Sequence, residues 1–232
     1  MKALILAAGR GTRMEALTDH CPKPLLKVNG QHLIEFHLHA LQQAGIQEVI
    51  INTSYLAEQI HRTLGNGARY GVNITYSNEG PNALETAGGI VNALPLLGSE
   101  PFIVINGDVW TDYNLAQLMT KKTLKYALAH LVLVNNPSHN LKGDFGMDAQ
   151  GYLTDQPTRY TYSGIGLYSP ALFANQTIQK RPLAPLLKQV ISEKKVCGEY
   201  YSGHWLDVGT PERLEYLRGC LNQSPKKEPK FV

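Results

Sequence analysis

A short stretch near the start of the chain, residues 6–25, has the residue types and spacing of a phosphate-binding loop. It contains Gly9 and Gly11, then Arg13 and Lys23. Glycines adopt positive φ angles and let backbone N–H groups approach an anion closely. Arginine offers a forked pair of donors to phosphate oxygens, whereas lysine offers a compact charge. Because an apolar segment that predicts a strand, Ala3–Ala7, comes directly before it, we expect this loop to hold phosphates at a strand end.

The glycine pattern alone leaves other interpretations open. Gly9 and Gly11 also fit an ordinary turn between a strand and a helix. A dinucleotide fingerprint needs a third glycine that opens a helix at once, and a Walker loop needs Gly-Lys followed by Ser or Thr. Neither pattern is present in this stretch. A dinucleotide-dependent oxidoreductase is therefore disfavoured.

Two separate aspartates have positions that suit a metal ion. Asp108 follows an apolar segment, residues 102–106, that predicts a strand, and Asp207 precedes the final predicted helix. Mg²⁺ prefers a few carboxylates together with substrate phosphates and water. Each aspartate alone also fits a turn or a helix cap, a role for which Asp112 competes with Asp108. We expect Asp108 and Asp207 to act together as the metal ligands.

The elements that must position these residues alternate between strands and helices in the first half of the chain. Predicted strands cover residues 3–7, 48–52, 73–76 and 102–106, and predicted helices begin near 33, 56 and 86 and end at Gly45, Gly65 and Pro95. This alternation predicts an α/β fold, a doubly wound and mostly parallel sheet. In such sheets ligands bind beyond the carboxyl ends of the strands. The loops after Ala7, Tyr76 and Asn106 should therefore face one crevice.

The second half of the chain is richer in strand patterns. We expect strands at 127–134, 144–147, 152–154, 160–168 and 196–201, and helices at 183–193 and 211–221, the last capped by Thr210. We expect one domain over residues 1–221, with a first part at about 1–124 and a second at about 125–221. Residues 222–232 are polar and interrupted by proline, which predicts a flexible tail.

Composition narrows the class of protein. The chain has 232 residues, 43% of them hydrophobic, and a formal net charge of +3 with its basic residues scattered, which does not indicate a nucleic-acid partner. No apolar run approaches the roughly 20 residues that span a bilayer, so no membrane partner is expected. We expect a cytoplasmic protein. The sequence does not indicate an oligomeric state.

Four motifs in order give the chain a family resemblance. These are LAAGRGTRM, the later PKPL, the Asp after a strand in NGD, and WLDVGTP at residues 205–211. Together they resemble the sugar-1-phosphate nucleotidyltransferases, which join a nucleoside triphosphate to a sugar 1-phosphate. The resemblance implies a Rossmann-like nucleotidyltransferase fold, a second part that binds sugar, and Mg²⁺ on Asp108 and Asp207. It also implies catalytic roles for Lys23, Arg13 and Asp108, and a triphosphate held by Ala8, Gly9, Gly11, Thr12, Arg13 and Lys23.

The resemblance also covers the regions that would choose the base and the sugar. The segment LETAGGI resembles the family's LGTAGA pattern, with Glu85 in place of its first glycine, and implies nucleotide contacts from Glu79, Thr86 and Gly88. Thr86 equally fits a helix cap. The sugar-side motifs imply contacts from Gly143, Asp144, Gly164 and Trp205.

Departures in these motifs resemble one branch of the family. Tyr162 stands where Asn is usual, and the variant segments are most similar to the branch that transfers a uridylyl group from UTP to N-acetylmuramate 1-phosphate in bacterial cell-wall recycling. That sugar carries a lactyl carboxylate, for which Lys142 and Arg159 are candidate cations. Two alternatives stay open. One is a thymidylyl- or guanylyltransferase acting on glucose or mannose 1-phosphate, and the other is a non-catalytic sensor of the same fold.

Overall fold

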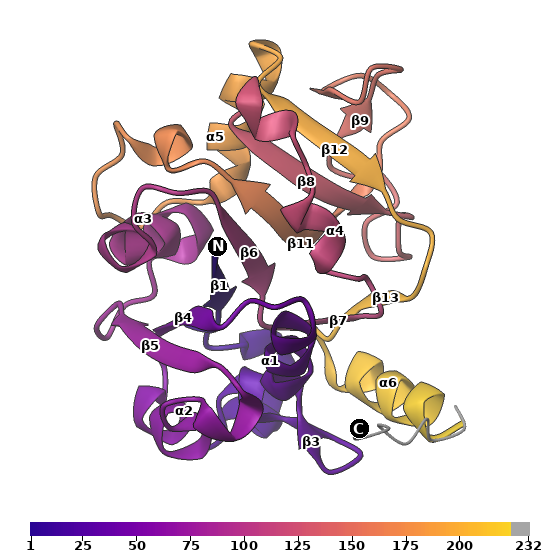
Figure 1. Cartoon of the computed structure of the whole chain (residues 1–232). Coiled ribbons are helices and arrows are strands. Elements are labelled where there is room, and N and C mark those ends of the chain that lie inside the picture. Colours follow the sequence, from indigo (N-terminus) through magenta and orange to yellow (C-terminus); the bar gives the residue numbers. More distant parts are fainter. Residues whose placement is uncertain (224–232) are drawn as a thin grey trace.

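The computed structural model describes residues 1–223, in which helices pack on both faces of a seven-stranded sheet (Figure 1). The strand order across the sheet is β12-β8-β11-β6-β1-β4-β5. The strands are β1 (Lys2–Leu6), β4 (Glu48–Thr53), β5 (Asn73–Asn78), β6 (Phe102–Asn106), β8 (Ala129–Val134), β11 (Thr161–Tyr168) and β12 (Val196–Tyr200).

Most strands of this sheet run in the same direction. β6, β1, β4 and β5 pair in parallel, as do β8 and β12, whereas β11 is antiparallel to both of its neighbours, β6 and β8. The predicted doubly wound and mostly parallel α/β sheet is therefore confirmed. The strand-rich second half of the chain extends the same sheet across β11.

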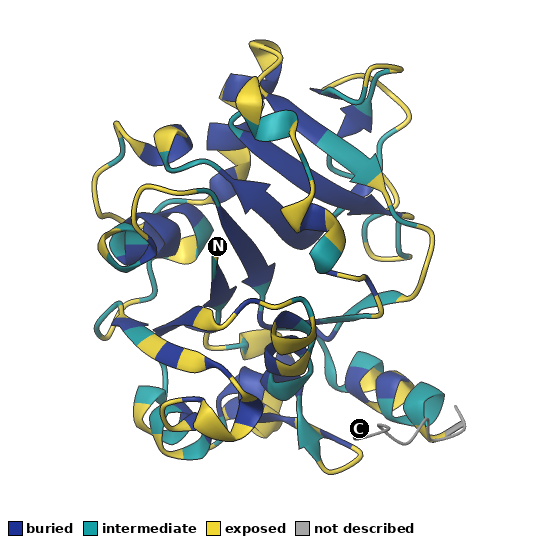
Figure 2. Cartoon of the chain, in the orientation of Figure 1, coloured by how far each residue is buried: buried dark blue, intermediate teal, exposed yellow. Residues whose placement is uncertain are grey.

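The apolar character of the central strands explains this arrangement. Ala3, Leu4 and Ile5 of β1 are all fully buried, as expected of a parallel strand covered on both faces. Ala3 and Ile5 share a hydrophobic cluster with α1, and Leu4 shares another with α3. Figure 2 shows the central strands β1, β6, β8 and β11 as almost continuously buried, while the edge strand β5 and the helices carry exposed residues. Side chains thus alternate between two cores, one on each side of the sheet.

The helices are α1 (Leu33–Gln43), α2 (Ala57–Leu64), α3 (Glu85–Leu97), α4 (Ala116–Met119), α5 (Leu183–Ser192) and α6 (Pro211–Gln223). The first two end before glycines with positive φ, Gly45 and Gly65, as predicted. The predicted end of α3 at Pro95 is wrong, because the helix continues to Leu97. Pro95 lies in the last turn, where its missing N–H removes one hydrogen bond, and Gly98 with φ 87° follows the helix end.

Several short elements were not predicted. They are the ribbons β2–β3 (Lys27–Val28 with Gln31–His32) and β7–β13 (Val109–Thr111 with Trp205–Asp207), and the 3-10 helices η1 (Thr12–Thr18), η2 (Lys23–Leu25), η3 (Ala68–Tyr70), η4 (Thr123–Lys125) and η5 (Pro170–Phe173). A third ribbon, β9–β10 (Gly146–Met147 with Leu153–Thr154), lies within the predicted strands at 144–147 and 152–154. With two or three residues per strand, the β2–β3 and β7–β13 ribbons carry too short a pattern to detect.

The final helix is attached by its own small core. Leu214 and Leu217 of α6 pack with Met14, Val28 and Val208. Thr210 Oγ1 accepts a bond of 3.4 Å from the N–H of Arg213, in agreement with its predicted cap role. Of the predicted tail, residues 224–232 lie outside the described residues. Among the helices within residues 1–223, none is both long and apolar enough to cross a bilayer.

Candidate active site

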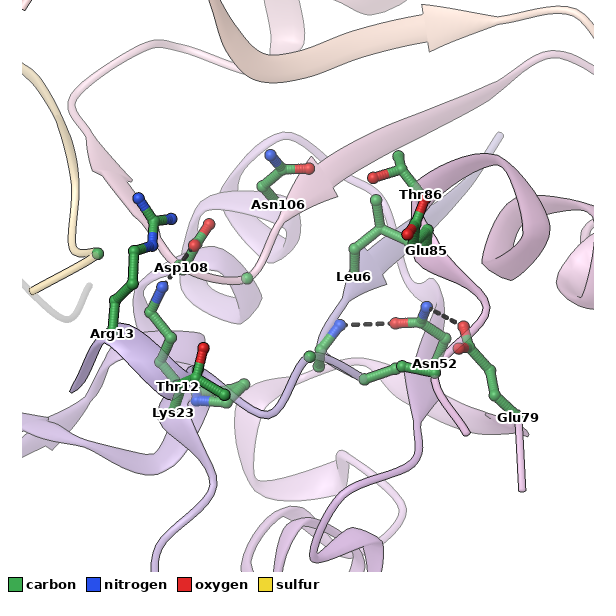
Figure 3. Close-up of a pocket in the computed structure, with 18 residues that line it drawn as sticks. Leu6, Thr12, Arg13, Lys23, Asn52, Glu79, Glu85, Thr86, Asn106 and Asp108 are labelled. Atoms are coloured by element: carbon green, nitrogen blue, oxygen red, sulfur yellow. Dashed lines mark hydrogen bonds and ion pairs between the residues drawn. The ribbon is translucent and has the colours of Figure 1, made fainter. Parts of the chain in front are cut away.

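A cavity of about 340 Å³ lies at the carboxyl edge of the parallel strands (Figure 3). Its walls come from the loops after β1, β5 and β6, the three loops expected to face one crevice. Among the predicted site residues, those that line it are Ala8, Gly9, Gly11, Thr12, Arg13, Lys23, Glu79, Thr86 and Asp108. The structure therefore brings together the predicted phosphate loop, one of the two predicted metal carboxylates and part of the predicted base site.

The glycine loop packs directly on the stem of Lys23. Gly11 has φ 69°, and a side chain there would meet Cβ and Cδ of Lys23 at 3.2 Å. The hydroxyl of Thr18 donates to the carbonyl oxygen of Gly11 at 3.0 Å and fixes the turn. A residue larger than glycine at position 11 would strain the backbone and displace the lysine.

Lys23 and Asp108 form an ion pair in the wall of the cavity. The ammonium nitrogen lies 2.6 Å from Oδ2 of Asp108, and Lys23 is only 7% exposed. Gly107 makes this approach possible, since its N–H donates to the carbonyl oxygen of Leu6 at 2.9 Å and a Cβ there would lie 2.7 Å from that oxygen. The ends of β1 and β6 are thereby held together beneath the pair.

Asp207 reaches this region through the β7–β13 ribbon. Asp207 is opposite Val109 in the ribbon, and the N–H of Val208 donates to the backbone oxygen of Asp108 at 2.7 Å. Its carboxylate lies 2.5 Å from Nη1 of Arg213 and 3.0 Å from Nε2 of His139. Asp207 itself does not line the cavity, but Gly209 does, and a Cβ on Gly209 would lie 3.3 Å from its Oδ2. The second predicted carboxylate is thus next to the cavity wall.

The side of the cavity predicted to hold the base contains a hydrogen-bonded pair, Glu79 and the buried Asn52, of which Asn52 was not predicted. Its Oδ1 accepts from the N–H of Ala7 at 2.6 Å, and its Nδ2 donates to Glu79 at 2.5 Å. Glu79 also accepts from the N–H of Leu84 at 2.7 Å. Burial raises the pKa of Glu79, although these two hydrogen bonds oppose the shift. Gly89 leaves room for the pair, since a Cβ there would lie 2.4 Å from Glu79 Oε1.

The start of α3 is capped by a distant loop. The N–H groups of Ala87 and Gly88 donate to the backbone oxygen of Arg181 at 3.0 and 3.2 Å. Gly88 does not line the cavity, and a Cβ there would lie 2.2 Å from the carbonyl oxygen of Gln179. Thr86 faces the cavity and forms no cap, so the alternative interpretation of Thr86 as a helix cap is not what the structure has. Glu85 lines the cavity with φ 60°, a conformation that suits the glycine it replaces.

None of the predicted sugar residues Gly143, Asp144, Gly164 and Trp205 lines the cavity. Gly143 has φ 61° and abuts the backbone of Arg159. Asp144 accepts from the N–H of Tyr162 at 2.8 Å, and Trp205 Nε1 donates to the oxygen of Ser163 at 2.9 Å. These contacts organise the loops next to β11.

Gly164 is the predicted sugar residue that comes closest to the cavity. A Cβ at this position would lie 2.6 Å from Nδ2 of Asn106, a residue that lines the cavity. Tyr162 points into the core, where its hydroxyl lies 2.8 Å from that of Tyr168. Of the candidate cations, Lys142 is exposed, and Arg159 donates to Asp155 at 2.8 Å.

Comparison with known proteins matches this arrangement to one family. The model of the nucleotidyl transferase family matches residues 2–219. The chain belongs to the nucleotidyl transferase family. An N-acetylmuramate alpha-1-phosphate uridylyltransferase of Neisseria meningitidis serogroup B is 48% identical over 93% of this chain and 96% of its own length. Another of the same name, from Caulobacter vibrioides, is 30% identical over 90% of this chain and 92% of its own length.

A solved structure agrees with the fold. A Bacillus anthracis protein assigned as a glucose-1-phosphate thymidylyltransferase superposes with a TM-score of 0.84 and 21% identity, covering 98% of both chains. At that identity the likeness shows the fold alone. This nucleotidyl transferase therefore has the architecture of the family along nearly all of its described length.

Nucleotidyl transferases generally use a divalent metal ion, and the residues present fit one. Within residues 1–223 no three His, Cys, Asp or Glu side chains gather as a metal-binding group. The ribbon nevertheless places the backbone of Asp207 next to that of Asp108, which lines the cavity. An ion that takes its other ligands from phosphates and water needs no larger protein set. Each carboxylate is neutralised here by an internal cation, Lys23 for Asp108 and Arg213 for Asp207.

A buried histidine that was not predicted, His37, lies near Asp108 and the backbone of Asn106 and Val109 in this nucleotidyl transferase. His37 of α1 is 4% exposed. Burial lowers its pKa to about 4, against the opposing influence of the Asp108 charge and of backbone groups at Val109 and Asn106. His37 is therefore neutral at physiological pH and adds no charge beneath Asp108.

Some polar side chains around the cavity already have hydrogen-bond or ion-pair partners within the protein, and others do not. Lys23, Asp108, Asn52 and Glu79 have partners. Within residues 1–223, the side chains of Thr12, Arg13, Thr86 and Asn106 form no hydrogen bond or ion pair. These four extend from different walls, so the cavity offers unpaired donors on its phosphate, base and β6 sides (Figure 3).

Proposed function

We propose that this chain transfers a uridylyl group from UTP to N-acetylmuramate α-1-phosphate, giving UDP-N-acetylmuramate and pyrophosphate. The Lys23–Asp108 pair carries the proposal, since it lies between the glycine loop and the ribbon that holds Asp207. The relatives from Neisseria and Caulobacter, which cover nearly the whole chain, supply the choice of nucleotide and sugar.

The proposed reaction is an in-line displacement at phosphorus. An oxygen of the sugar 1-phosphate forms a bond to the α-phosphorus of UTP, and the bond from that phosphorus to the bridging oxygen of the β-phosphate breaks. Pyrophosphate leaves with that oxygen, and no covalent enzyme intermediate is needed. Because the nucleophile is already an anion, the protein mainly positions two like-charged substrates and neutralises charge.

The roles of individual residues follow from their places around the cavity. Lys23 exchanges its partner Asp108 for the reacting phosphates. Arg13 and the N–H groups of residues 9–12 hold the β- and γ-phosphates as negative charge develops on the leaving group. Thr86 and Glu79 face the uridine.

Mg²⁺ is the ion we assign to Asp108 and Asp207. When bound, it would neutralise phosphate charge and hold the α-phosphate and the sugar phosphate in line. Lys23 and Arg213, which pair with these carboxylates in the absence of substrate, then become available to anionic ligands. The substrates are small molecules, and since UTP is a cytoplasmic metabolite, we place the protein in the cytoplasm, in cell-wall recycling.

A substrate panel tests the proposal. UTP, dTTP and GTP are each combined with N-acetylmuramate, glucose and mannose 1-phosphates, and pyrophosphate release is measured. We expect the pair of UTP and N-acetylmuramate 1-phosphate to give the highest kcat/KM. A higher value with dTTP or GTP and a hexose phosphate would replace this function with a thymidylyl- or guanylyltransferase. Binding of nucleotide without release from any pair would indicate a sensor.

A further inference from the structure

Asn106 carries an unpaired amide at the carboxyl end of β6. Its side chain lines the cavity, yet it has no hydrogen-bond partner among the described residues. The other asparagine of the cavity wall, Asn52, has both ends of its amide paired, with Ala7 and Glu79. An unpaired amide in a cavity from which a ligand excludes water is unfavourable unless the ligand supplies its partners. Asn106 is therefore suited to contact a substrate group.

The surrounding backbone is shaped around this amide. Gly164 of β11 has φ 80°, and a Cβ there would lie 2.6 Å from Nδ2 of Asn106. The register between β11 and β8 shifts between Tyr162 and Gly166, so the strand bulges where the amide meets it. Trp205 Nε1 bonds the oxygen of Ser163 and holds this bulge. The amide of Asn106 thus lies against Gly164 at the bulge of β11, the strand next to β6.

The position of Asn106 separates it from both nucleotide-facing groups. Asn106 precedes the ion-paired Asp108 by two residues, and in Figure 3 it lies between the Arg13–Lys23–Asp108 group and the Glu85–Thr86 group. The cations of the cavity are on the phosphate side. Asn106 is neutral and faces β11, which carries the predicted sugar residue Gly164. Its partner is accordingly a neutral polar group of the sugar.

We propose that Asn106 binds the 2-acetamido group of the sugar 1-phosphate and thereby selects 2-acetamido sugars over sugars with a 2-hydroxyl. This inference rests on the proposed function and names the sugar feature that the site recognises. The primary amide of Asn106 has an N–H donor and a carbonyl acceptor, and the acetamido group offers the matching carbonyl and N–H. A 2-hydroxyl is shorter and has no carbonyl, so it leaves one of the two Asn106 groups unpaired.

The test compares sugar phosphates that differ at this group. Wild-type protein and Asn106→Ala are assayed with N-acetylmuramate 1-phosphate, N-acetylglucosamine 1-phosphate and glucose 1-phosphate at saturating UTP, and the KM for UTP is measured separately with UTP varied. We expect kcat/KM for the two acetamido sugars to fall about tenfold, with the value for glucose 1-phosphate and the KM for UTP changing by less than about twofold. Where turnover of a sugar is slow, calorimetric binding in the presence of a non-hydrolysable UTP analogue gives the same comparison.

Two further variants keep the result interpretable. Asn73→Ala removes an exposed asparagine at the amino end of β5, on the edge of the sheet away from the cavity, and should leave every value unchanged. Asn106→Ser replaces the amide with a shorter side chain that carries a hydroxyl. Provided it melts like the wild type, it should show the same selective loss.

The pattern of losses decides whether Asn106 contacts the 2-acetamido group. A selective loss for the acetamido sugars supports the role of Asn106. An equal loss for all three sugars, or a change confined to the KM for UTP, overturns it. Failure of the proposed function appears separately, as a wild-type protein that does not turn over N-acetylmuramate 1-phosphate. A tenfold selective loss in calorimetric binding of N-acetylglucosamine 1-phosphate would then still support the acetamido contact, and no such loss would overturn it.

Discussion

The ammonium nitrogen of Lys23 lies 2.6 Å from Oδ2 of Asp108, 85 positions away in the chain. Each group neutralises the other in the protein without substrate. Binding of a triphosphate and a metal ion would give each a new partner, the phosphates for the lysine and the ion for the carboxylate. Lys23 and Asp108 can therefore each change partners on substrate binding without either charge being left unpaired.

Replacing Lys23 with alanine should nearly abolish turnover. Loss of one preorganised charge at a reacting phosphate typically costs about 2.7 to 4 kcal/mol, a hundredfold or more in kcat. Because the Asp108 side chain is 33% exposed, water can take the place of the lost ammonium, and we expect the melting temperature to change little. Pyrophosphate release and circular dichroism check the two parts. Near-normal turnover in a folded Lys23→Ala protein would remove Lys23 from the reaction.

Asp207→Asn should weaken metal binding as well as catalysis. The amide retains the size of the carboxylate but loses the charge that an ion requires. We expect about hundredfold slower turnover, a higher Mg²⁺ requirement, and weaker Mn²⁺ binding by electron paramagnetic resonance with UTP present. Glu193→Gln, which removes a surface carboxylate paired with Lys195, is the matched control. Unchanged Mn²⁺ binding would exclude Asp207 as a ligand.

The two arginines of the glycine loop should differ in their effects. Arg13 lines the cavity and has no partner among the described residues, whereas Arg10 stacks over the ring of Tyr55, 5.3 Å from its centroid. Arg13→Ala should therefore lower kcat/KM for UTP at least tenfold, with a smaller effect on the sugar phosphate. Arg10→Ala should change both values by less than about threefold. Steady-state kinetics with each substrate varied in turn distinguishes them, and equal effects would contradict the division.

His37 should make the folded protein sensitive to mild acid. Burial lowers its pKa in the folded state to about 4, from the ordinary value of 6.5. Between these values the unfolded chain binds the proton more readily, so stability falls as pH decreases from 6.5 to 4 and is unaffected by this group above 6.5. The loss amounts to at most about 3 kcal/mol. His37→Gln should flatten the decline in free energy of unfolding over that range, measured by urea titration, whereas replacing the exposed His20 should not.

Two glycines within helices should respond in opposite directions to alanine. In Gly88→Ala the new Cβ meets the carbonyl oxygen of Gln179 at 2.2 Å, so the loop that caps α3 must move and the protein should lose about 1–3 kcal/mol of stability. A Cβ on Gly219 of α6 would have no neighbouring atom within 4 Å, so Gly219→Ala should stabilise by about 0.5–1 kcal/mol. Thermal melts compare the two, and destabilisation by both would mean that the space around Gly219 is not open.

The sequence predicted those features that depend on local patterns. The bounds of β6 agree with the predicted strand at residues 102–106, and the loops after β1, β5 and β6 line one cavity. Continuous apolar runs and flanking glycines are strong signals of buried parallel strands. Asn52 was missed, although it lies near the carboxyl end of a predicted strand, the same rule that pointed to Asp108. The roles assigned to Lys23, Arg13, Asp108 and Asp207 stay predictions.

Other features depend on contacts between distant segments. No local pattern indicates that Arg213 and His139 pair with Asp207, or that the carbonyl of Arg181 caps α3. Gly88 was assigned to the nucleotide from its motif, whereas its lack of a side chain serves a close approach of Gln179. Tertiary packing decides such positions, and a motif read without it does not separate a ligand contact from a packing contact.

The β7–β13 ribbon also has a consequence for protein synthesis. Residues that form the glycine loop, Lys23 and Asp108 all emerge from the ribosome well before Trp205–Asp207, the strand that completes the ribbon. Because the chain is made from its N-terminus, the residues of the predicted triphosphate loop are present before Asp207, the second predicted metal carboxylate. A chain interrupted before β13 would thus still contain the residues of the predicted triphosphate loop, but would lack Asp207, one of the two carboxylates we propose for the ion.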